Sequence, residues 1–257
     1  MQEHEIIGLL TEAGIDNARF EAGLLLKGVK AEGLDEAVRR RAAGYPLQYL
    51  LGEWDFYRET YEVSEDCLIP RSDTEILVEQ AVKLLPQSAH FLDLCTGSGC
   101  IAVSTLCARP DATAIAVDLF EPTLALAARN AKRNGADARV SFLRADVLQK
   151  PPTGLCEGGF DAILSNPPYI RGEAMAVLQR EVTFEPRAAL YGGEDGLDFY
   201  RAILKNWRKL LKPEGFVLLE IGYDQADELL ALGKDHGLSG QVFRDYGGND
   251  RVVYLKQ

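Results

Sequence analysis

The chain has 257 residues, 47% of them apolar and 26% charged, which is enough for one large domain or for a typical domain with a small one. A net charge of −11 argues against a protein that coats DNA or RNA, and no run approaches the ~18 apolar residues that a membrane span needs. The five cysteines have no paired spacing, which gives no sign of a disulfide framework, and the three histidines are scattered, which gives no sign of a metal site. The N-terminus is acidic and does not resemble a leader peptide. We therefore expect a reduced cytoplasmic protein.

Residues 1–70 are expected to form a small helical domain that ends in a hairpin. Apolar residues cluster in three short stretches that are typical of helices, at 6–10, 18–26 and 34–43, and Gly14 and Gly44 end the first and the third. Aromatic and polar residues alternate roughly over 53–69, which predicts a hairpin that links the two halves of the chain. Ser72, with Glu75 three residues later, is a capping box and predicts a helix to about Leu85.

From residue 89 onward, short apolar runs alternate with helical stretches, a pattern typical of a parallel sheet with helices on both faces. The expected strands are 90–94, 114–117, 140–143, 160–164 and 215–221, and the expected helices lie near 100–108, 121–134 and 196–212. The last two strands, 240–244 and 251–255, flank a turn so short that it can join only antiparallel strands. We therefore predict an α/β domain over 71–257 with an antiparallel final hairpin.

The first strand of this sheet runs into the loop D-L-C-T-G-S-G-C-I-A, residues 93–102. Glycines between a strand and a helix let the backbone approach a ligand, and the helix N-terminus presents free N–H groups to it. Gly97, Gly99 and Ala102 also fit the dinucleotide pattern G-x-G-x-x-A, and a tight turn that binds nothing is an alternative for the loop taken by itself.

Acidic residues at the ends of the next two strands strengthen the prediction of a bound nucleoside. Asp118 follows the glycines by about 20 residues, where it can accept hydrogen bonds from ribose hydroxyls; capping of the next helix is an alternative role for it. Asp146 ends the third strand and can accept an adenine amino group, while Val147 packs on the ring. Because ligands bind at the carboxyl ends of parallel strands, we expect one shared site.

The fourth strand ends in S-N-P-P-Y-I, residues 165–170, where two prolines forbid a helix and stiffen the chain. The Asn166 side-chain oxygen and the Pro167 carbonyl can each accept one N–H of a planar –NH2 group, which aims its nitrogen and stabilises developing positive charge. Tyr169 offers a flat face for stacking. We interpret 166–169 as a rigid clamp for a planar amide or a nucleobase, between which the motif does not choose, and direct transfer to that nitrogen needs no strong base.

The pattern D-x-x-T-G-S-G followed by A-V-D resembles the S-adenosylmethionine-dependent methyltransferases of the Rossmann-like class, which favours methyl transfer over hydride transfer. Longer motifs resemble the HemK/PrmC family, the glutamine methyltransferases of peptide chain release factors. These motifs are G-Y-P-L-Q-Y-L-L-G at 44–52, L-I-P-R-S-D-T-E at 68–75, N-P-P-Y-I at 166–170, F-E-P-R-A-A-L-Y-G-G-E-D-G-L at 184–197, E-I-G at 220–222 and D-Y-G-G-N-D-R-V-V at 245–253.

The resemblance implies an enzyme that moves a methyl group from S-adenosylmethionine, with S-adenosylhomocysteine as product, to the glutamine of the Gly-Gly-Gln motif in class I release factors. Its cofactor positions carry over to Cys95, Thr96, Gly97, Ser98, Gly99, Asp118, Val147 and Asn166, and Asp146 is added on physical grounds. Its catalytic and substrate-clamp positions carry over to Asn166, Pro167, Pro168 and Tyr169. The chain departs from the family at Cys95, where glycine is usual, at Ser72, where proline is usual, and at Val147, where some members have a large aromatic residue.

The family also has a variable N-terminal helical domain, so residues 1–70 are expected to dock the rest of the release factor. We expect a monomer that binds neither membrane nor nucleic acid, and residues 191–196 to form either a lid or a plain loop that leads into a helix. Three other functions remain alternatives. A ribosomal-protein glutamine methyltransferase would share the clamp, an adenine methyltransferase would need a basic groove, and an inactive binding module would not need an intact clamp.

Overall fold

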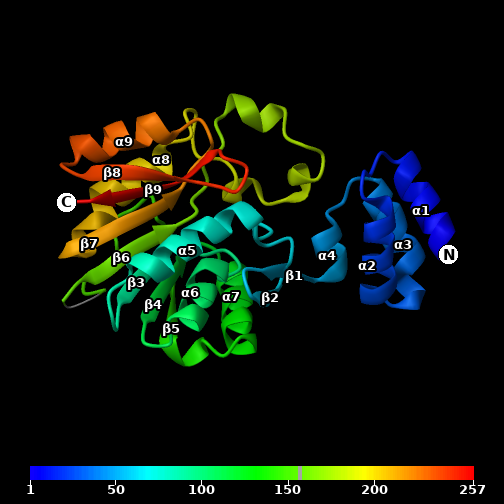
Figure 1. Ribbon diagram of the computed structural model, residues 1–257, viewed down its shortest axis with the longest axis horizontal. Helices are drawn as coiled ribbons and strands as arrows, with labels where there is room; N and C mark the ends of the chain where they lie inside the picture. The colour runs from blue at the N-terminus through cyan, green and yellow to red at the C-terminus, as the bar shows by residue number, and fades with distance from the viewer. Residues whose placement is uncertain (156–157) are drawn as a thin grey trace.

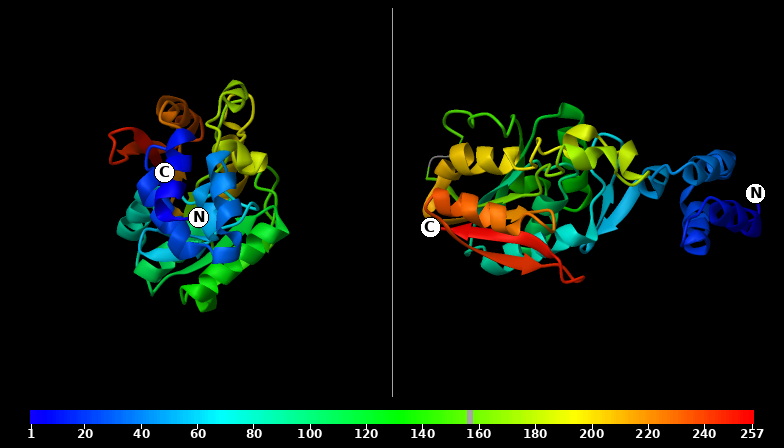
Figure 2. Two further views of the ribbon diagram at one scale, coloured as in Figure 1. Left: turned by 90° about the vertical axis from the view of Figure 1, so that its right-hand side faces the viewer. Right: turned by 90° about the horizontal axis from the view of Figure 1, so that it is seen from above.

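The computed structural model describes residues 1–155 and 158–257, so Cys156 lies outside the described residues. The molecule is elongated. The N-terminal helices lie at one end, a large sheet with its covering helices lies at the other, and a short hairpin stands between them (Figure 1; Figure 2, right).

The N-terminal helices form a group with its own core. They are α1 (Glu3–Glu12), α2 (Ala18–Gly28), α3 (Ala31–Ala42) and α4 (Leu47–Leu51). Ile6, Leu10, Leu25 and Val38 are fully buried among them. The three predicted helices are confirmed. The short α4, which starts after Pro46, was not predicted, because five residues carry no readable period.

The hairpin of β1 (Glu53–Phe56) and β2 (Glu59–Glu62) packs on the sheet, since Phe56 and Tyr61 belong to a core cluster of the sheet. The predicted capping box after it is wrong. Residues Ser72–Thr74 form a 3-10 turn, and α5 (Glu75–Leu84) starts without a side-chain cap. The Glu75 carboxylate accepts the backbone N–H of Tyr57 at 3.0 Å, so it stabilises the hairpin turn and is not available to cap its own helix.

The described strands of the large sheet follow the order β5-β4-β3-β6-β7-β9-β8. They are β3 (His90–Leu94), β4 (Thr113–Asp118), β5 (Val140–Arg144), β6 (Phe160–Ser165), β7 (Leu211–Glu220), β8 (Ser239–Arg244) and β9 (Asp250–Lys256). Neighbours pair in parallel except at β9, which is antiparallel to both β7 and β8. The predicted α/β fold with its antiparallel final hairpin is confirmed.

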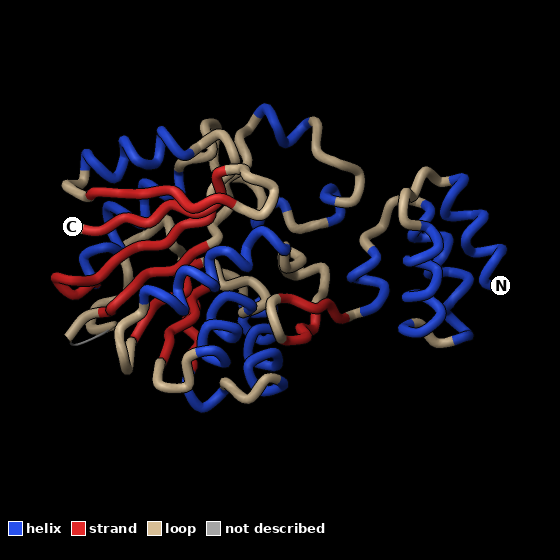
Figure 3. The backbone as a smooth tube through the Cα atoms, viewed as in Figure 1, coloured by secondary structure: helices blue, strands red, loops and turns tan. Residues whose placement is uncertain are grey.

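Helices cover both faces of this sheet (Figure 3). One core cluster contains residues of α5, α6 (Cys100–Ala108) and α7 (Glu121–Arg133), and the other contains residues of α8 (Asp198–Ala202), η6 (Ile203–Trp207) and α9 (Ala226–Asp235). Successive residues of β7 alternate between them, with Phe216 and Leu218 in the first and Val217 and Leu219 in the second.

The helix expected over 196–212 is shorter and less regular than predicted. After α8 the chain turns into the π-helix η6, passes through a 3-10 turn and enters β7 already at Leu211. Trp207, at the end of η6, is fully buried, and its indole N–H donates to the Val147 carbonyl at 2.9 Å. The irregular turn thus ties this layer of helices to the loop after β5. The helix α9 was not predicted.

None of the helices in the described part of the chain is long and apolar enough to span a bilayer. The described cysteines, Cys67, Cys95, Cys100 and Cys107, are free thiols. Within 1–155 and 158–257, no group of three metal-ligating side chains comes together.

Candidate active site

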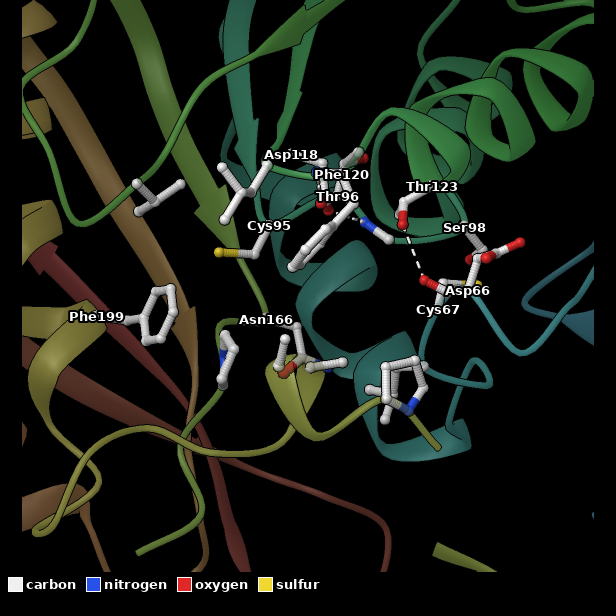
Figure 4. A pocket seen from close by; sticks show the side chains of 18 of the residues that line it. Asp66, Cys67, Cys95, Thr96, Ser98, Asp118, Phe120, Thr123, Asn166 and Phe199 are labelled. Carbon is white, nitrogen blue, oxygen red and sulfur yellow. Dashed lines mark hydrogen bonds between the residues drawn. The ribbon is translucent and has the colours of Figure 1, made fainter. Parts of the chain in front are cut away.

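A cavity of about 550 Å³ opens at the carboxyl ends of β3, β4, β5 and β6. Most of the predicted site residues line it: Cys95, Thr96, Gly97, Ser98, Asp118, Asp146, Val147, Asn166 and Pro168. Gly99, Pro167 and Tyr169 do not. In Figure 4, Asp118, Phe120 and Thr96 lie along one wall, and Asn166 lies across the cavity from them. Residues that follow four separate strands thus lie together at one cavity, at the strand ends where the sequence predicts a shared site.

The glycine loop is folded around a buried acid that sequence reasoning did not single out. Asp93, at the end of β3, accepts the Thr96 hydroxyl at 2.6 Å and the Ala102 N–H at 3.2 Å, both through Oδ2. Burial raises the pKa of Asp93 to about 7, with the Thr96 and Ala102 hydrogen bonds opposing the rise. Because one carboxylate holds both ends of the loop, the loop is preformed around the cavity.

The backbone of this loop requires left-handed conformations. Gly97 has φ 55°, Gly99 has φ 81°, and Cys95 has φ 59°. A Cβ added at Gly99 would lie 3.1 Å from the Ala127 Cβ on α7, so Gly99 supports the loop from behind and does not face the cavity. Cys95 stands where the resembled family usually has glycine, and its positive φ is the physical reason that glycine suits the position.

Asp118 holds the glycine loop and the residue that precedes α7, and its role toward a ribose stays a prediction. Its Oδ2 accepts the Gly97 N–H at 3.0 Å, and its Oδ1 accepts the N–H of Phe120, the residue that precedes α7, at 3.2 Å. Burial raises its pKa. Each carboxylate oxygen still has an unused lone pair for a ligand hydroxyl. The hydrogen bonds to Gly97 and Phe120 therefore do not exclude binding of a ribose by Asp118.

The loop after β5 presents Asp146 and Val147 to the cavity. Asp146 accepts the Leu148 N–H at 2.9 Å in a tight turn, which leaves its second oxygen unpartnered within the described residues. Val147 is buried, and its carbonyl accepts the Trp207 indole N–H. The apolar side chain and the carboxylate therefore stand next to each other on a fixed backbone.

Asn166 is held at the end of β6. The preceding residue, Ser165, donates its hydroxyl to the Leu94 carbonyl at 2.6 Å, which locks the ends of β6 and β3 together. The Asn166 Nδ2 donates to the Thr74 hydroxyl oxygen at 3.2 Å. Its Oδ1 and the Pro167 carbonyl accept no hydrogen bond from the described residues. The site thus contains two neighbouring acceptors on a rigid segment.

Tyr169 corrects one expectation from the sequence. Its hydroxyl donates to Glu220 Oε1 at 3.3 Å, and burial raises its pKa. The ring packs with the core on the α8 and α9 side of the sheet and is not part of the cavity wall. Tyr169 therefore supports the clamp from below and does not offer its face for stacking.

Residues 191–196 pack tightly against the clamp. The Ile170 N–H donates to the Leu190 carbonyl at 2.8 Å, and the Gly192 N–H donates back to the Ile170 carbonyl at 3.0 Å. A Cβ at Gly192 would lie 2.6 Å from the Tyr169 Cα. Of the two readings of this segment, the contacts favour a fixed loop that leads into α8 over a lid.

Two walls of the cavity were missing from the sequence-based site, namely the segments 66–71 and 186–191. Thr123 of α7 donates its hydroxyl to the Asp66 carbonyl at 2.8 Å and so holds the first wall (Figure 4). Glu185 joins the two walls, because it accepts the Ile69 N–H at 3.0 Å and pairs with Arg71. The sequence motifs at 68–75 and 184–197 overlap these two walls and could have pointed to them. The chemistry of their residues alone did not suggest a role in the site.

Known proteins match the chain over nearly its whole length. Residues 72–194 match the family described as methyltransferase small domain. The chain is 40% identical to the release factor glutamine methyltransferase of Geobacter sulfurreducens, with 96% of this chain and 92% of that protein covered. It is 37% identical to the protein of the same name from Salmonella typhimurium, with 97% and 95% covered.

A solved methyltransferase structure from Pyrococcus furiosus, 21% identical, matches with a TM-score of 0.57 over 76% of this chain and 86% of that chain, which shows a shared fold. On the sequence identity to the relatives and the extent of their coverage, the chain belongs to the family of release factor glutamine methyltransferases.

Proposed function

We propose that the protein transfers a methyl group from S-adenosylmethionine to the side-chain amide nitrogen of the glutamine in the Gly-Gly-Gln motif of class I release factors. The single observation that carries this proposal is the geometry of Asn166, whose Nδ2 is engaged by Thr74 while its Oδ1 has no partner among the described residues. An acceptor fixed in this way fits a planar donor such as a glutamine amide.

The residues present fit S-adenosylmethionine. A volume of about 550 Å³ lies within the range of ordinary ligand pockets. Gly97 lines the cavity, and a Cβ there would meet no protein atom within 4 Å, so the loop leaves room for a close ligand. We assign the amino-acid part of the cofactor to the loop 95–99, the ribose hydroxyls to Asp118, and the adenine to Asp146 and Val147. When bound, the cofactor supplies an electrophilic methyl group on a positively charged sulfur.

The chain's own contribution to the reaction is orientation. Asn166 Oδ1 and the Pro167 carbonyl each accept one N–H of the substrate amide, so the nitrogen is held in one place and its growing positive charge meets two fixed acceptors. Pro168 and the tightly packed Gly192 keep this backbone from moving. No histidine lines the cavity among the described residues, in keeping with a transfer that needs no strong base.

The test is mass spectrometry of a purified class I release factor after incubation with the protein and S-adenosylmethionine. We expect a gain of one methyl group on the Gly-Gly-Gln glutamine, its loss with Asn166→Ala, and an unchanged gain with the matched control Asn206→Ala, which lies away from the cavity. A methyl group that appears only on a ribosomal protein, or only on adenine in nucleic acid, would replace the proposal with the corresponding alternative.

We also propose that residues 1–70 are a docking domain for the rest of the release factor. In support, the helices of this part have their own core and expose apolar side chains, with Phe20 64% and Leu9 42% exposed. Phe20→Ser should raise KM for the intact factor and not for a short Gly-Gly-Gln peptide. Tyr223→Ser, a control on the sheet domain with a similar exposure of 70%, should change neither KM value. Equal KM values for Phe20→Ser and wild type on the intact factor would exclude docking at this surface.

We further propose that the protein is a monomer and that it is located in the cytoplasm. The free thiols of the described cysteines support a reducing compartment.

A further inference from the structure

The segment 171–191 extends from the sheet domain to the N-terminal helices, where it meets the end of α3 and the loop that follows it (Figure 1; Figure 2, right). The Arg41 side chain, in the last turn of α3, pairs with Glu181 at 2.8 Å. The Tyr45 ring meets the Phe184 ring edge-on, with 5.3 Å between the ring centroids. Because 186–191 is a wall of the cavity, the N-terminal helices contact a segment that also shapes the active site.

The same part of the chain contacts the other wall, 66–71, and the residue that precedes it. Tyr49 of α4 donates its hydroxyl to the Cys67 carbonyl at 2.6 Å. The Tyr45 hydroxyl donates to the Glu65 carboxylate, which also pairs with Arg40 at 3.5 Å. Tyr45 is buried, so its hydroxyl and its ring connect the ends of both wall segments to the N-terminal helices.

Arg41 is the buried charge of this junction. Only 3% of the residue is exposed, which is unusual for an arginine unless it is paired. Its Nη2 donates to Glu21 of α2 at 2.9 Å and pairs with Glu181, and its Nη1 donates to the Tyr45 carbonyl at 3.3 Å. The planar guanidinium, with five N–H donors in fixed directions, thus connects α2, α3, the next loop and the sheet domain at once.

Parts of one chain that meet at a small interface usually move relative to each other. At this junction, directional hydrogen bonds and a buried arginine fix an angle as well as a distance. The cavity walls do not need these contacts for their own position, because Glu185 joins the walls by accepting the Ile69 N–H and pairing with Arg71. What the junction adds is a fixed placement of the N-terminal helices relative to the cavity.

We propose that Arg41 and Tyr45 are positioning residues, which hold the N-terminal helices in one orientation so that a docked release factor presents its glutamine to Asn166 and Pro167. This inference rests on the proposed function and on the proposed docking at residues 1–70. A fixed orientation keeps the effective concentration of the glutamine loop at the clamp high, whereas a swinging docking domain would spread that loop over many positions. A short peptide, which binds without docking, gains nothing from the junction.

The first experiment measures the orientation of the N-terminal helices without any substrate. In wild type, we expect the backbone N–H residual dipolar couplings of α1–α3 and of the large sheet to fit one common alignment tensor. In the double variant Tyr45→Leu/Glu181→Gln, each part should still fit a tensor of its own, which shows that it is folded, but the two tensors should differ. Two different tensors in wild type, or one common tensor in the double variant, would overturn the inference.

Glu181 is replaced in this variant and Arg41 is kept. Loss of Arg41 would also leave Glu21 without its partner and disturb the N-terminal helices themselves. Glu181, whose side chain is 48% exposed, can lose its charge without harm to the fold. Leucine keeps position 45 apolar while it removes both the hydroxyl and the ring.

The second experiment compares kcat/KM for an intact class I release factor with kcat/KM for a short Gly-Gly-Gln peptide. Tyr45→Leu and Glu181→Gln should each lower the value for the intact factor about 5-fold, the effect of one lost hydrogen bond. The value for the peptide and Kd for S-adenosylhomocysteine should stay at wild type, because Glu185 still joins the walls. The matched control is Glu214→Gln, which breaks an ion pair with Lys256 away from the cavity and should change none of these values.

The two substrates separate positioning from a general structural role. An equal fall of kcat/KM for the factor and for the peptide would show that the junction merely supports the cavity, and the inference would be wrong. Wild-type kcat/KM for the intact factor in the double variant would contradict it as well. If wild type methylates neither substrate while the dipolar couplings behave as expected, the proposed function fails and the fixed orientation of the N-terminal helices stands.

Discussion

The Asp118 carboxylate accepts the backbone N–H of Gly97 at 3.0 Å, which fastens the end of β4 to the glycine loop that follows β3. Asp118→Asn keeps the shape of the side chain but removes its charge and one of its two accepting oxygens. We expect Kd for S-adenosylmethionine to rise about 10- to 100-fold, the usual loss for a hydrogen bond to a charged group. Calorimetry would measure this, with Asp235→Asn, an exposed aspartate at the end of α9, as the control that leaves Kd unchanged.

The close contact of Gly192 with the clamp leads to a prediction about turnover. A Cβ at Gly192 would lie 2.6 Å from the Tyr169 Cα and 2.7 Å from the Pro168 carbonyl oxygen, so Gly192→Ala must displace the clamp backbone. A displacement of this kind can cost about 100-fold in kcat.

The matched control for that variant is Gly8→Ala in α1, where a Cβ meets no atom within 4 Å. It should leave kcat unchanged and raise the free energy of unfolding by up to about 1 kcal/mol, because alanine favours a helix over glycine. Wild-type turnover in Gly192→Ala would contradict the fixed position of the clamp.

Cys95 stands where the family usually has glycine, so it allows a test of backbone strain at that position. At φ 59°, a side chain is disfavoured and glycine is not. Cys95→Gly and Cys95→Ala both remove the thiol, so their difference isolates the backbone effect. We expect the glycine variant to be more stable than the alanine variant by about 1 kcal/mol in urea unfolding. Equal stabilities would mean that the loop relaxes out of the left-handed region.

The stability of the protein should depend on pH through Glu220. Burial raises the pKa of Glu220 from 4.5 to about 7, helped by Asp73 and opposed by Thr74, Arg251 and Tyr169. The folded state therefore holds this proton more tightly than the unfolded state does. The resulting stabilisation is complete below pH 4.5 and is lost as pH rises through about 7.

Unfolding free energies at a series of pH values, compared between wild type and Glu220→Gln, would measure this effect. Burial also raises the pKa of Asp93 to about 7, but Asp93 is present in both proteins, so the difference between the two curves belongs to Glu220. That difference should fall by up to about 1.4 kcal/mol per pH unit between pH 5 and 7. Parallel curves would contradict the raised pKa.

The strands of the sheet were predictable because buried parallel strands are continuous apolar runs that stand out against the helices between them. The helix α9 was not. Its apolar stripe is interrupted by Gly233, which is required for close packing, since a Cβ there would lie 2.7 Å from a Leu255 methyl group. Gly233 therefore lies on the buried face of α9 and lets this helix approach β9 closely.

The residues of the candidate site likewise include some that the sequence predicts and some that it does not. Residues at strand ends, such as Asp118 and Asn166, were predictable because topology alone brings those ends together. Tyr169 was expected to stack on the substrate, but its hydroxyl donates to Glu220, which lies 51 residues further along the chain and could not be foreseen from the local pattern. Glu75 failed as a cap for the same reason, since its carboxylate serves Tyr57. Local patterns miss polar side chains whose partners come from distant parts of the chain.

The position of β9 makes the order of assembly differ from the order of synthesis. Val253 of β9 pairs with Leu219 of β7 on one side and with Val242 of β8 on the other, so β8, although made earlier, cannot join the sheet until β9 has inserted. Arg251 arrives with the same strand. Insertion of β9 therefore also brings the Arg251 guanidinium to its partners Asp73 and Asp245. An opening of the sheet at this edge would switch off turnover while the glycine loop, on the opposite side of β6, still bound its ligand.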